Sequence, residues 1–416
     1  MVWFVIFFPV LAALATVYLA KRGEKALGLW AVIATGATLL GMIIAAVSGF
    51  GGVYTLPILH LTVALDGFRC LYGIVVCFMW FVAAMLSPQY FRHHHNLGRY
   101  YFFFLLCLSS TVGVFLSAHL YTTFMFFEMM SIGSYVWVAQ EETEGAMDAG
   151  KTYLTIAVLG GLVTLMGLFL LHNVTGTLLV SELREACMAT TERGKLWAAA
   201  LCIFFGFAAK AGLYPLHNWL PAAHPAAPAP ASALLSGLIA KAGVIAVVRV
   251  LFFTVDLTAL RGTWVQTVCV ILALVTVFMG SFMGCFEKVL KKRLAYSSIS
   301  QISYVLLGLF LLSEEALTGS MLQLFFHAAA KIALFQCAGA VILLTGRTRT
   351  DELRGLGRKM PWVFIAFALA SLSLVGIPPF GGFWSKWYLA TAALEALPGF
   401  LSYAVPVVLL LSALFT

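Results

Sequence analysis

Charged residues are scarce in this sequence, and their scarcity excludes most kinds of soluble protein. Only 10% of the 416 residues are charged, whereas 62% are hydrophobic and the mean hydropathy is +0.99. A soluble domain carries roughly 25% charged and 45–50% apolar residues. The sequence therefore predicts a polytopic membrane protein.

The formal net charge of +8 does not indicate a nucleic-acid partner. A nucleic-acid-binding protein gathers its basic residues on one surface or one helix. Here they lie in short loops between apolar segments. We interpret them as signals that set the orientation of the chain in the membrane, and we expect no nucleic acid as a partner.

Cysteine motifs are also missing. None of the eight cysteines belongs to a CxxC pair or a ferredoxin-like run; they are Cys70, Cys77, Cys107, Cys187, Cys202, Cys269, Cys285 and Cys337. We therefore expect no metal cluster, no disulfide framework and no cofactor in this chain.

The N-terminal apolar stretch, Val2 to Ala20, lacks the arrangement of a cleavable signal. Its charges, Lys21, Arg22 and Lys25, follow the apolar core, whereas a signal peptide carries them before it. This stretch should remain as a spanning helix.

The apolar segments predict thirteen membrane spans, since a span needs about 20 mostly apolar residues. They cover about 2–20, 26–48, 68–88, 100–118, 120–139, 152–172, 196–214, 231–254, 264–285, 295–313, 318–344, 361–396 and 399–416. The seventh meets a break at Tyr214-Pro215 and the twelfth meets one at the Pro378-Pro379 pair, so we expect two broken helices.

The loops divide by charge. Loops after spans 1, 3, 5, 7, 9 and 11 hold 15 of the Lys and Arg residues, and the alternate loops hold four. The positive-inside rule places the first set in the cytoplasm and the N-terminus outside.

The breaks suggest an internal repeat in an all-α fold. Spans 4 to 8 and 9 to 13 each contain five helices, and the fourth of each set is the broken one. Because five is odd, the second set would enter the membrane from the opposite side, as in inverted-topology transporters. We predict three parts: N-terminal helices (1–99), a first repeat (100–254) and a second repeat (255–416).

Four lysines lie inside predicted spans: Lys210, Lys241, Lys331 and Lys386. A lysine at the bilayer centre costs about 2.5 to 3.5 kcal/mol on insertion scales. Lys210 and Lys386 lie beside the two breaks, where a hydrated cavity is expected because freed backbone groups need partners. Arg69 and Arg249 are near span ends, where we expect their side chains to reach the membrane surface.

Glu128 is the one acidic residue deep in a span, and it is a natural partner for a lysine. Burial disfavours a charged lysine and a nearby carboxylate restores it, so a change in the Glu128–Lys210 distance would make the lysine hold or release a proton. His327 lies four residues before Lys331, on the same helix face, and titrates near neutrality.

Other interpretations remain open for these residues. A buried lysine can be a structural ion-pair partner, Glu128 can hold a helix pair together, and His327 can simply hydrogen-bond a carbonyl.

Several weaker features accompany them. The run from His93 to His95 is expected to be a solvated loop and not a metal site. His217 and His224 either feed protons into a cavity or belong to a rigid connector. Ser232 and Ser236 either bind water near Lys241 or allow close helix packing.

The sequence resembles the antiporter-like subunits shared by respiratory complex I, energy-converting membrane-bound hydrogenases and Mrp sodium/proton antiporters. The resemblance extends from about the third span onward. It rests on FFEMMSIGSYVW, FGFAAKAGLYPLHNWLPAAHPAAPAPASALLSGLIAKAG, KKRLAYSSISQISYVLLG, FFHAAAKIALFQCAG and GIPPFGGFWSKWYL.

The resemblance implies roles for the buried residues. Glu128 would pair with Lys210, Lys241 would connect two half-channels, and His327 with Lys331 would lead to Lys386 as the terminal element, a position that is glutamate in some members. It also implies other membrane subunits and a hydrophilic redox arm as partners, with lipid around the chain. Quinone, flavin and iron–sulfur ligands would belong to other subunits.

This sequence departs from the family in two ways. Members usually have fourteen or more spans, whereas the given chain stops at Thr416, which leaves open whether its C-terminus is complete. It also lacks the long lateral helix of the distal complex I subunit, which favours a middle position in a subunit array.

Three functions are compatible with the sequence. The first is an ion-translocating subunit of a redox-driven, complex I-like or hydrogenase-like complex in a prokaryotic cytoplasmic membrane. The second is a subunit of an Mrp-type sodium/proton antiporter without redox input. The third, a scaffold that only conducts or seals, does not explain four costly lysines.

Overall fold

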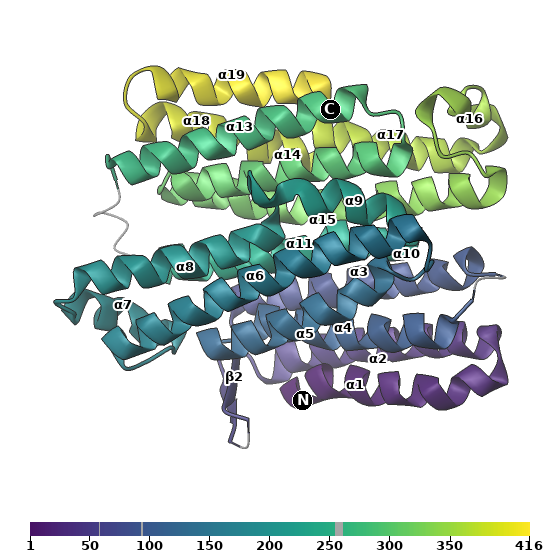
Figure 1. The fold of residues 1–416 in the computed structure, drawn as a ribbon, viewed down its shortest axis with the longest axis horizontal. Coiled ribbons are helices and arrows are strands. Elements are labelled where there is room, and N and C mark those ends of the chain that lie inside the picture. The colour runs from purple at the N-terminus through teal and green to yellow at the C-terminus, as the bar shows by residue number, and fades with distance from the viewer. Residues whose placement is uncertain (58, 93–94, 254–260) are drawn as a thin grey trace.

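The computed structural model describes residues 1–57, 59–92, 95–253 and 261–416, and its helices lie side by side along the molecule (Figure 1). The first eleven are α1 (Val2–Leu19), α2 (Glu24–Ser48), α3 (Gly67–Tyr90), α4 (Leu97–Leu116), α5 (Leu120–Val138), α6 (Glu144–Thr175), α7 (Val180–Ala189), α8 (Arg193–Ala211), α9 (Trp219–Ala226), α10 (Ala229–Leu234) and α11 (Ala240–Phe253). The rest are α13 (Trp264–Phe286), α14 (Leu290–Phe310), α15 (Glu314–Thr345), α16 (Leu356–Lys359), α17 (Pro361–Val375), α18 (Gly381–Ala396) and α19 (Phe400–Phe415).

Short elements connect these helices. They are the turns η1 (Ala20–Arg22), η2 (Leu216–Asn218), η3 (Leu235–Ile239, a π-helix) and η4 (Thr350–Leu353), and the antiparallel strands β1 (Val53–Leu56) and β2 (Leu61–Ala64). The hairpin of β1 and β2 projects away from the bundle beside the N-terminal helices, across the direction of the helices (Figure 1).

Within the described residues, nine helical segments are long and apolar enough to cross a membrane. The segments that miss this criterion include α5 and α14, which carry Glu128 and a Lys- and Ser-rich start, and α17 and α19, which are short. The chain is thus an integral membrane protein, whereas the count of thirteen spans stays a prediction.

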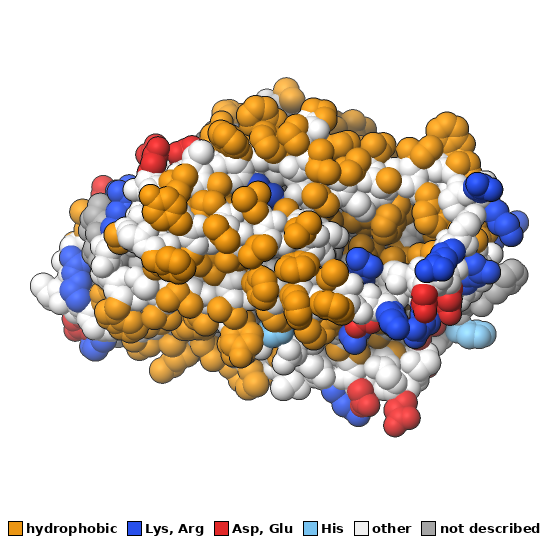
Figure 2. All heavy atoms as spheres, turned by 90° about the horizontal axis from the view of Figure 1, so that it is seen from above, with side chains coloured by type: hydrophobic (Ala, Val, Ile, Leu, Met, Phe, Trp, Pro, Cys, Tyr) orange, Lys and Arg blue, Asp and Glu red, His pale blue; other side chains and the backbone are white. Residues whose placement is uncertain are grey.

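Contacts near the helix ends show which loops lie at the same end of the bundle. At one end, Arg99 forms an ion pair with Glu142 and Lys291 donates to the carbonyl of Ala227. At the other, Arg261 donates to the carbonyl of Leu312. The predicted third and fifth loops therefore meet, as do the seventh and ninth, whereas the eighth loop meets the end of the tenth span. Seen from above, Lys and Arg gather near α16 at one end, whereas hydrophobic side chains cover much of the face (Figure 2).

Both predicted helix breaks are present. Gly212 directly follows α8 and Gly376 directly follows α17, and both glycines have positive φ values, 80° and 89°. A glycine adopts this left-handed conformation without the steric cost of a Cβ, so it terminates a helix well. Each break contains an X-Pro bond and is followed by a new helix, α9 or α18.

The corners of the two halves repeat one pattern. The turn before α5 pairs with the segment before α7 through His119 and Leu179, and the turn before α14 pairs with the segment before η4 through Val289 and Arg349. Each corner residue of the second half stands 170 positions after its counterpart in the first.

The same spacing relates α6 and α15, which have 32 residues each. The side chains of Thr143 and Ser313 cap their N-termini, and Gly176 and Gly346 end them in the left-handed conformation. Both pairs are also 170 residues apart. The boundary predicted at 254/255 lies outside the described residues.

The expectation for Arg249 was wrong, because its side chain does not reach the membrane surface. Arg249 is only 4% exposed, and it donates at 2.7 Å to the carbonyls of Val114 and of Phe115. These carbonyls lie in the last turn of α4, where no helical N–H is left to satisfy them. Arg69, the other arginine, is partly buried and donates to the carbonyl of Ser117. No local pattern in the sequence indicates that this helix end needs a cation.

Candidate functional site

Lys210 ends the first half of the broken helix, in the last turn of α8. It is 4% exposed, and its Nζ donates to the hydroxyl of Tyr153 on α6. The same nitrogen lies 3.9 Å from the centroid of the Tyr153 ring and 5.6 Å from that of Trp219. A phenol oxygen and two aromatic faces thus surround the ammonium group. Sequence reasoning missed Tyr153, for which no motif gave a signal.

Glu128 lies on α5 near Lys210, but the two side chains do not form an ion pair within 4.0 Å. Their charges are close enough to interact electrostatically. Oε1 of Glu128 is buried without a hydrogen-bond partner and packs against Gly161 of α6, where a Cβ would lie 2.5 Å from it. A bare backbone at Gly161 therefore makes room for the carboxylate.

Lys241 follows a π-helical turn. It is 1% exposed, and its Nζ donates to the carbonyl of Ser236 in η3. The hydroxyl of Ser236 is 2.6 Å from that of Ser298 on α14. π-turns are rare and often occur at functional sites. Ser236 thus lies beside Lys241, as its place in the sequence suggested, and no sequence pattern indicated the π-turn.

Lys331 and His327 share one face of α15, as their spacing predicted. Lys331 is fully buried and donates to the Leu294 carbonyl at 2.7 Å and to the hydroxyl of Ser297. His327 is 1% exposed, and neither ring nitrogen has a hydrogen-bond partner. The alternative in which His327 serves a carbonyl is therefore not the arrangement found in this structure.

Lys386 lies one turn after the start of α18 and turns back to the end of α17. Its half-buried side chain donates to the carbonyls of Leu374 at 2.6 Å and Val375 at 2.7 Å. Its Nζ is also 5.1 Å from the ring centroid of Tyr304. A helix C-terminus presents free carbonyls and a partial negative charge, so it stabilises an ammonium group.

None of the four lysines forms an ion pair with a carboxylate in the part of the chain that the structure describes. Each ammonium group is instead held by carbonyl or hydroxyl oxygens. The interpretation of these lysines as structural ion-pair partners is therefore not supported. Neutral oxygens suit a group that gains and loses a proton, because neither state leaves an unpaired carboxylate behind.

A single helix, α14, contacts the surroundings of three lysines. Ser297 accepts from Lys331, Ser298 contacts Ser236 beside Lys241, and the ring of Tyr304 faces Lys386. The segment SSISQISY supplies these side chains on α14. Sequence reasoning used this segment only as part of the family resemblance and assigned none of its residues.

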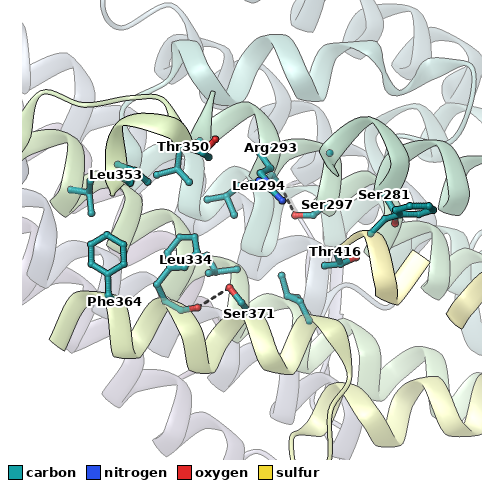
Figure 3. A pocket seen from close by; sticks show the side chains of 16 residues that line it. Ser281, Arg293, Leu294, Ser297, Leu334, Thr350, Leu353, Phe364, Ser371 and Thr416 are labelled. Carbon is teal, nitrogen blue, oxygen red and sulfur yellow. Dashed lines mark hydrogen bonds between the residues drawn. The ribbon is translucent and has the colours of Figure 1, made fainter. Parts of the chain in front are cut away.

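A cavity of about 210 Å³ lies between α13, α14, α15, α17 and α19. Figure 3 shows Leu294 and Ser297 on one of its walls and Ser371 on another. Leu294, Ser297 and Leu374 all line it, and these residues accept the hydrogen bonds of Lys331 and Lys386. The cavity therefore borders the binding groups of both lysines.

The remaining predicted residues lie around this row. His224 is fully buried beside the ring of Phe335 and neither nitrogen has a partner, and His217 stacks on Tyr214. Ser232 donates to the His224 carbonyl. Of the histidine run, residues 93 and 94 lie outside the described residues.

Known proteins are similar in sequence to this chain over most of its length. A family described as NADH:quinone oxidoreductase/Mrp antiporter, transmembrane, matches residues 117–412. A Na(+)/H(+) antiporter protein of Alkalihalophilus pseudofirmus, one of the subunits of that antiporter, is 34% identical over 286 residues, covering 69% of this chain and 57% of that protein. A subunit of the NADH-quinone oxidoreductase of Desulforudis audaxviator is 33% identical over 293 residues, covering 70% and 58%.

Solved structures share the fold. A chain of an archaeal membrane-bound sulfane sulfur reductase has a TM-score of 0.89 at 24% identity and covers 100% of this chain and 86% of its own. A chain of the Mrp complex from Dietzia sp. has a TM-score of 0.87 at 27% identity, covering 99% and 78%. This chain spans just over half the length of the curated relatives it matches. It belongs to the NADH:quinone oxidoreductase/Mrp antiporter transmembrane family.

Proposed function

We propose that this chain is an ion-translocating, antiporter-like subunit of a redox-driven membrane complex. The observation that carries the proposal is the set of four lysines whose ammonium groups donate to neutral oxygens inside the bundle. Ionisable groups at membrane depth mark ion pathways because they are costly to keep there. A scaffold would gain nothing from them.

The proposed path begins at Glu128 and Lys210, continues through Lys241, and passes His327 and Lys331 to Lys386. Electrostatic interaction between Glu128 and Lys210 supports the first step. The unpartnered nitrogens of His327 support a relay between the lysines of the second half, since they are free to bind water or a proton. The chain supplies the path, and the redox chemistry belongs to partner subunits.

A second candidate is a subunit of an Mrp-type sodium/proton antiporter. The relationship to an antiporter protein and to a chain of an Mrp complex favours it as directly as the NADH-quinone oxidoreductase relative favours the first candidate. In both cases the partners are other membrane subunits, because the solved neighbours are chains of multisubunit assemblies.

The halves are also proposed to be inverted repeats, covering 100–254 and 255–416. The constant spacing of 170 residues between their corners and helix caps supports this proposal. The clustered basic loops support an orientation with that end in the cytoplasm and the N-terminus outside, in a prokaryotic cytoplasmic membrane.

Purification of the intact assembly through a tag on this chain tests the proposal. Co-purification of a hydrogenase, a sulfur reductase or an NADH-oxidising arm, together with substrate-driven ion movement in vesicles, is the expected result. Companions that are all antiporter subunits, with ion exchange in the absence of any redox substrate, would replace the first candidate with the second.

A further inference from the structure

Two buried glutamines link the halves of the second broken helix. Gln301 on α14 is fully buried and Gln323 on α15 is 2% exposed. The Nε2 of Gln323 donates to the Oε1 of Gln301, and the Nε2 of Gln301 donates to the carbonyl of Leu374 at 3.3 Å. At the other end, the hydroxyl of Ser385 donates to the Oε1 of Gln323. A directed chain of three hydrogen bonds thus runs from α18 to the end of α17.

The two ends of this bridge, which is formed by the amides of Gln301 and Gln323, lie beside Lys386. Ser385 is the residue before Lys386 on α18, and the carbonyl oxygen of Leu374 accepts from Lys386 Nζ at 2.6 Å as well as from Gln301. The two donor nitrogens are at most 5.9 Å apart, which is the sum of their 3.3 and 2.6 Å distances to that oxygen. A carbonyl oxygen has two lone pairs, so it accepts both bonds at once.

Gln323 in the second half has a counterpart in the first half, Tyr153, which contacts a buried lysine. It stands 170 residues after Tyr153, at the spacing that relates the caps and corners of the halves. Tyr153 is the residue that binds the ammonium group of Lys210 directly. In the second half the equivalent position instead acts on its lysine through Gln301 and a shared carbonyl.

Amides suit such a role because they do not titrate. Each side chain offers one acceptor and two donors, and both acceptors are occupied here. A fully connected polar network inside a bundle fixes the geometry of its members. The bridge therefore holds the free end of α17 in place beside Lys386.

We propose that Gln301 is a positioning residue for Lys386, and that the amide bridge of Gln301 and Gln323 fixes how tightly this lysine holds its proton. The role rests on the proposed ion path. The titratable group in contact with Lys386 is Tyr304 on α14, and His327 on α15 is close enough to Lys386 to interact with its charge. α17 offers carbonyls, and α19 has no charged side chain.

The test replaces one amide by an isosteric carboxylate in the intact complex. In Gln301→Glu, the Oε1 acceptor is kept while a negative charge appears within reach of Lys386, which favours the charged lysine. The decline of ion movement at high pH should shift upward by about one unit. Gln266→Glu is the matched control, because Gln266 is also buried and donates to a carbonyl, that of Phe310, on the other side of the half.

A second measurement does not depend on ion movement. In a Lys386→Cys protein, the pH of half-maximal thiol alkylation, followed by mass spectrometry of the peptide, should rise by about one unit when Gln301→Glu is added, because a carboxylate disfavours the thiolate. Gln266→Glu should leave it unchanged.

The outcomes separate the two proposals. If Gln301→Glu changes neither profile beyond the Gln266→Glu control, the positioning role is overturned, and the ion path is then judged by Lys386→Ala alone. If alkylation shifts as expected while Lys386→Ala moves ions at the normal rate, the positioning role stands and the path through Lys386 fails.

Discussion

The two broken helices have the same backbone and different chemistry. α8 and α17 both end at a left-handed glycine, but the lysine precedes the first break and follows the second. Lys210 meets a phenol on α6 with Glu128 nearby, whereas Lys386 meets two carbonyls at the end of α17. A helix break therefore creates a place for a buried cation, and the neighbouring helices decide which groups hold it.

Because of this difference, movements of the helices affect the two lysine sites differently. The interaction between Glu128 and Lys210 depends on the distance between their side chains, so the first site is sensitive to the distance between two helices. The carbonyls of α17 carry a fixed dipole, so the second site changes only if the helix end itself moves. Under the proposed function, the first half would receive a signal from a neighbour, and the second would hold and release an ion.

Removal of either charge at the first break should have the largest effect. Lys210→Ala and Glu128→Ala should each reduce coupled ion movement by more than about tenfold, as loss of a proton-transfer group does. Ion movement in vesicles, normalised to assembled complex on native gels, measures it. Lys195→Ala is the control on the same helix, since its side chain is 55% exposed and paired with Glu192. Normal ion movement in either variant would contradict the assigned role.

Loss of the Tyr153 hydroxyl should affect the Lys210 site and leave the Lys386 site unchanged. Tyr153→Phe removes the acceptor of Lys210, a hydrogen bond to a charged group worth about 1.5 to 3 kcal/mol. The ammonium form loses stability, so the decline of ion movement at high pH should begin at least about one unit lower.

Tyr304→Phe is the matched control for that variant. Lys386 contacts the ring of Tyr304, which phenylalanine keeps, while the hydroxyl serves Ser412. The pH profile should therefore stay unchanged in Tyr304→Phe. Equal shifts of the pH profile in Tyr153→Phe and Tyr304→Phe would contradict the conclusion that a tyrosine hydroxyl holds Lys210 but not Lys386.

Exchange of the ionisable group at the second break should have a smaller effect. Lys386→Glu keeps a titratable side chain, and a protonated carboxyl can donate to the α17 carbonyls as the ammonium group does. Ion movement should fall by only about two- to fivefold, within the range of one lost hydrogen bond. Complete loss in an assembled complex would show that a positive charge is required.

The smallest effect is expected at the corner between α13 and α14. Burial alone would raise the pKa of Glu287, but hydrogen bonds from the Val289 N–H and from Lys292 hold it below its usual range. A depressed folded-state pKa adds stability above the ordinary value of about 4.3, and this stability is lost as the pH falls.

Glu287→Gln should therefore lower the free energy of unfolding by less than about 1 kcal/mol at pH 7, as for a half-exposed ion pair. Thermal unfolding at pH 7 and near pH 4 measures the difference, which should shrink at the lower pH. A difference that grows on acidification would contradict the assignment.

The sequence predicted the helix breaks and the buried lysines because both have strong local signals. A proline two or three residues after a glycine marks the end of a helix, and a lysine in an apolar run is expensive wherever the helix packs. The bonding partners have no such signal. Tyr153 lies 57 residues before Lys210, and Arg249 lies 135 residues after the Val114 carbonyl that it satisfies. The periodicity of apolar residues does not predict contacts between residues so far apart in the sequence.

Composition and hydropathy alone establish that the chain crosses a membrane with ionisable groups inside it, since they fix the transfer free energy of each segment. Three features emerge only from packing: neutral oxygens hold the four lysines, α14 touches the surroundings of three of them, and Arg249 closes a helix end. Hydrogen bonds need atoms within about 3 Å, and residues so distant in sequence come that close only when the helices pack together.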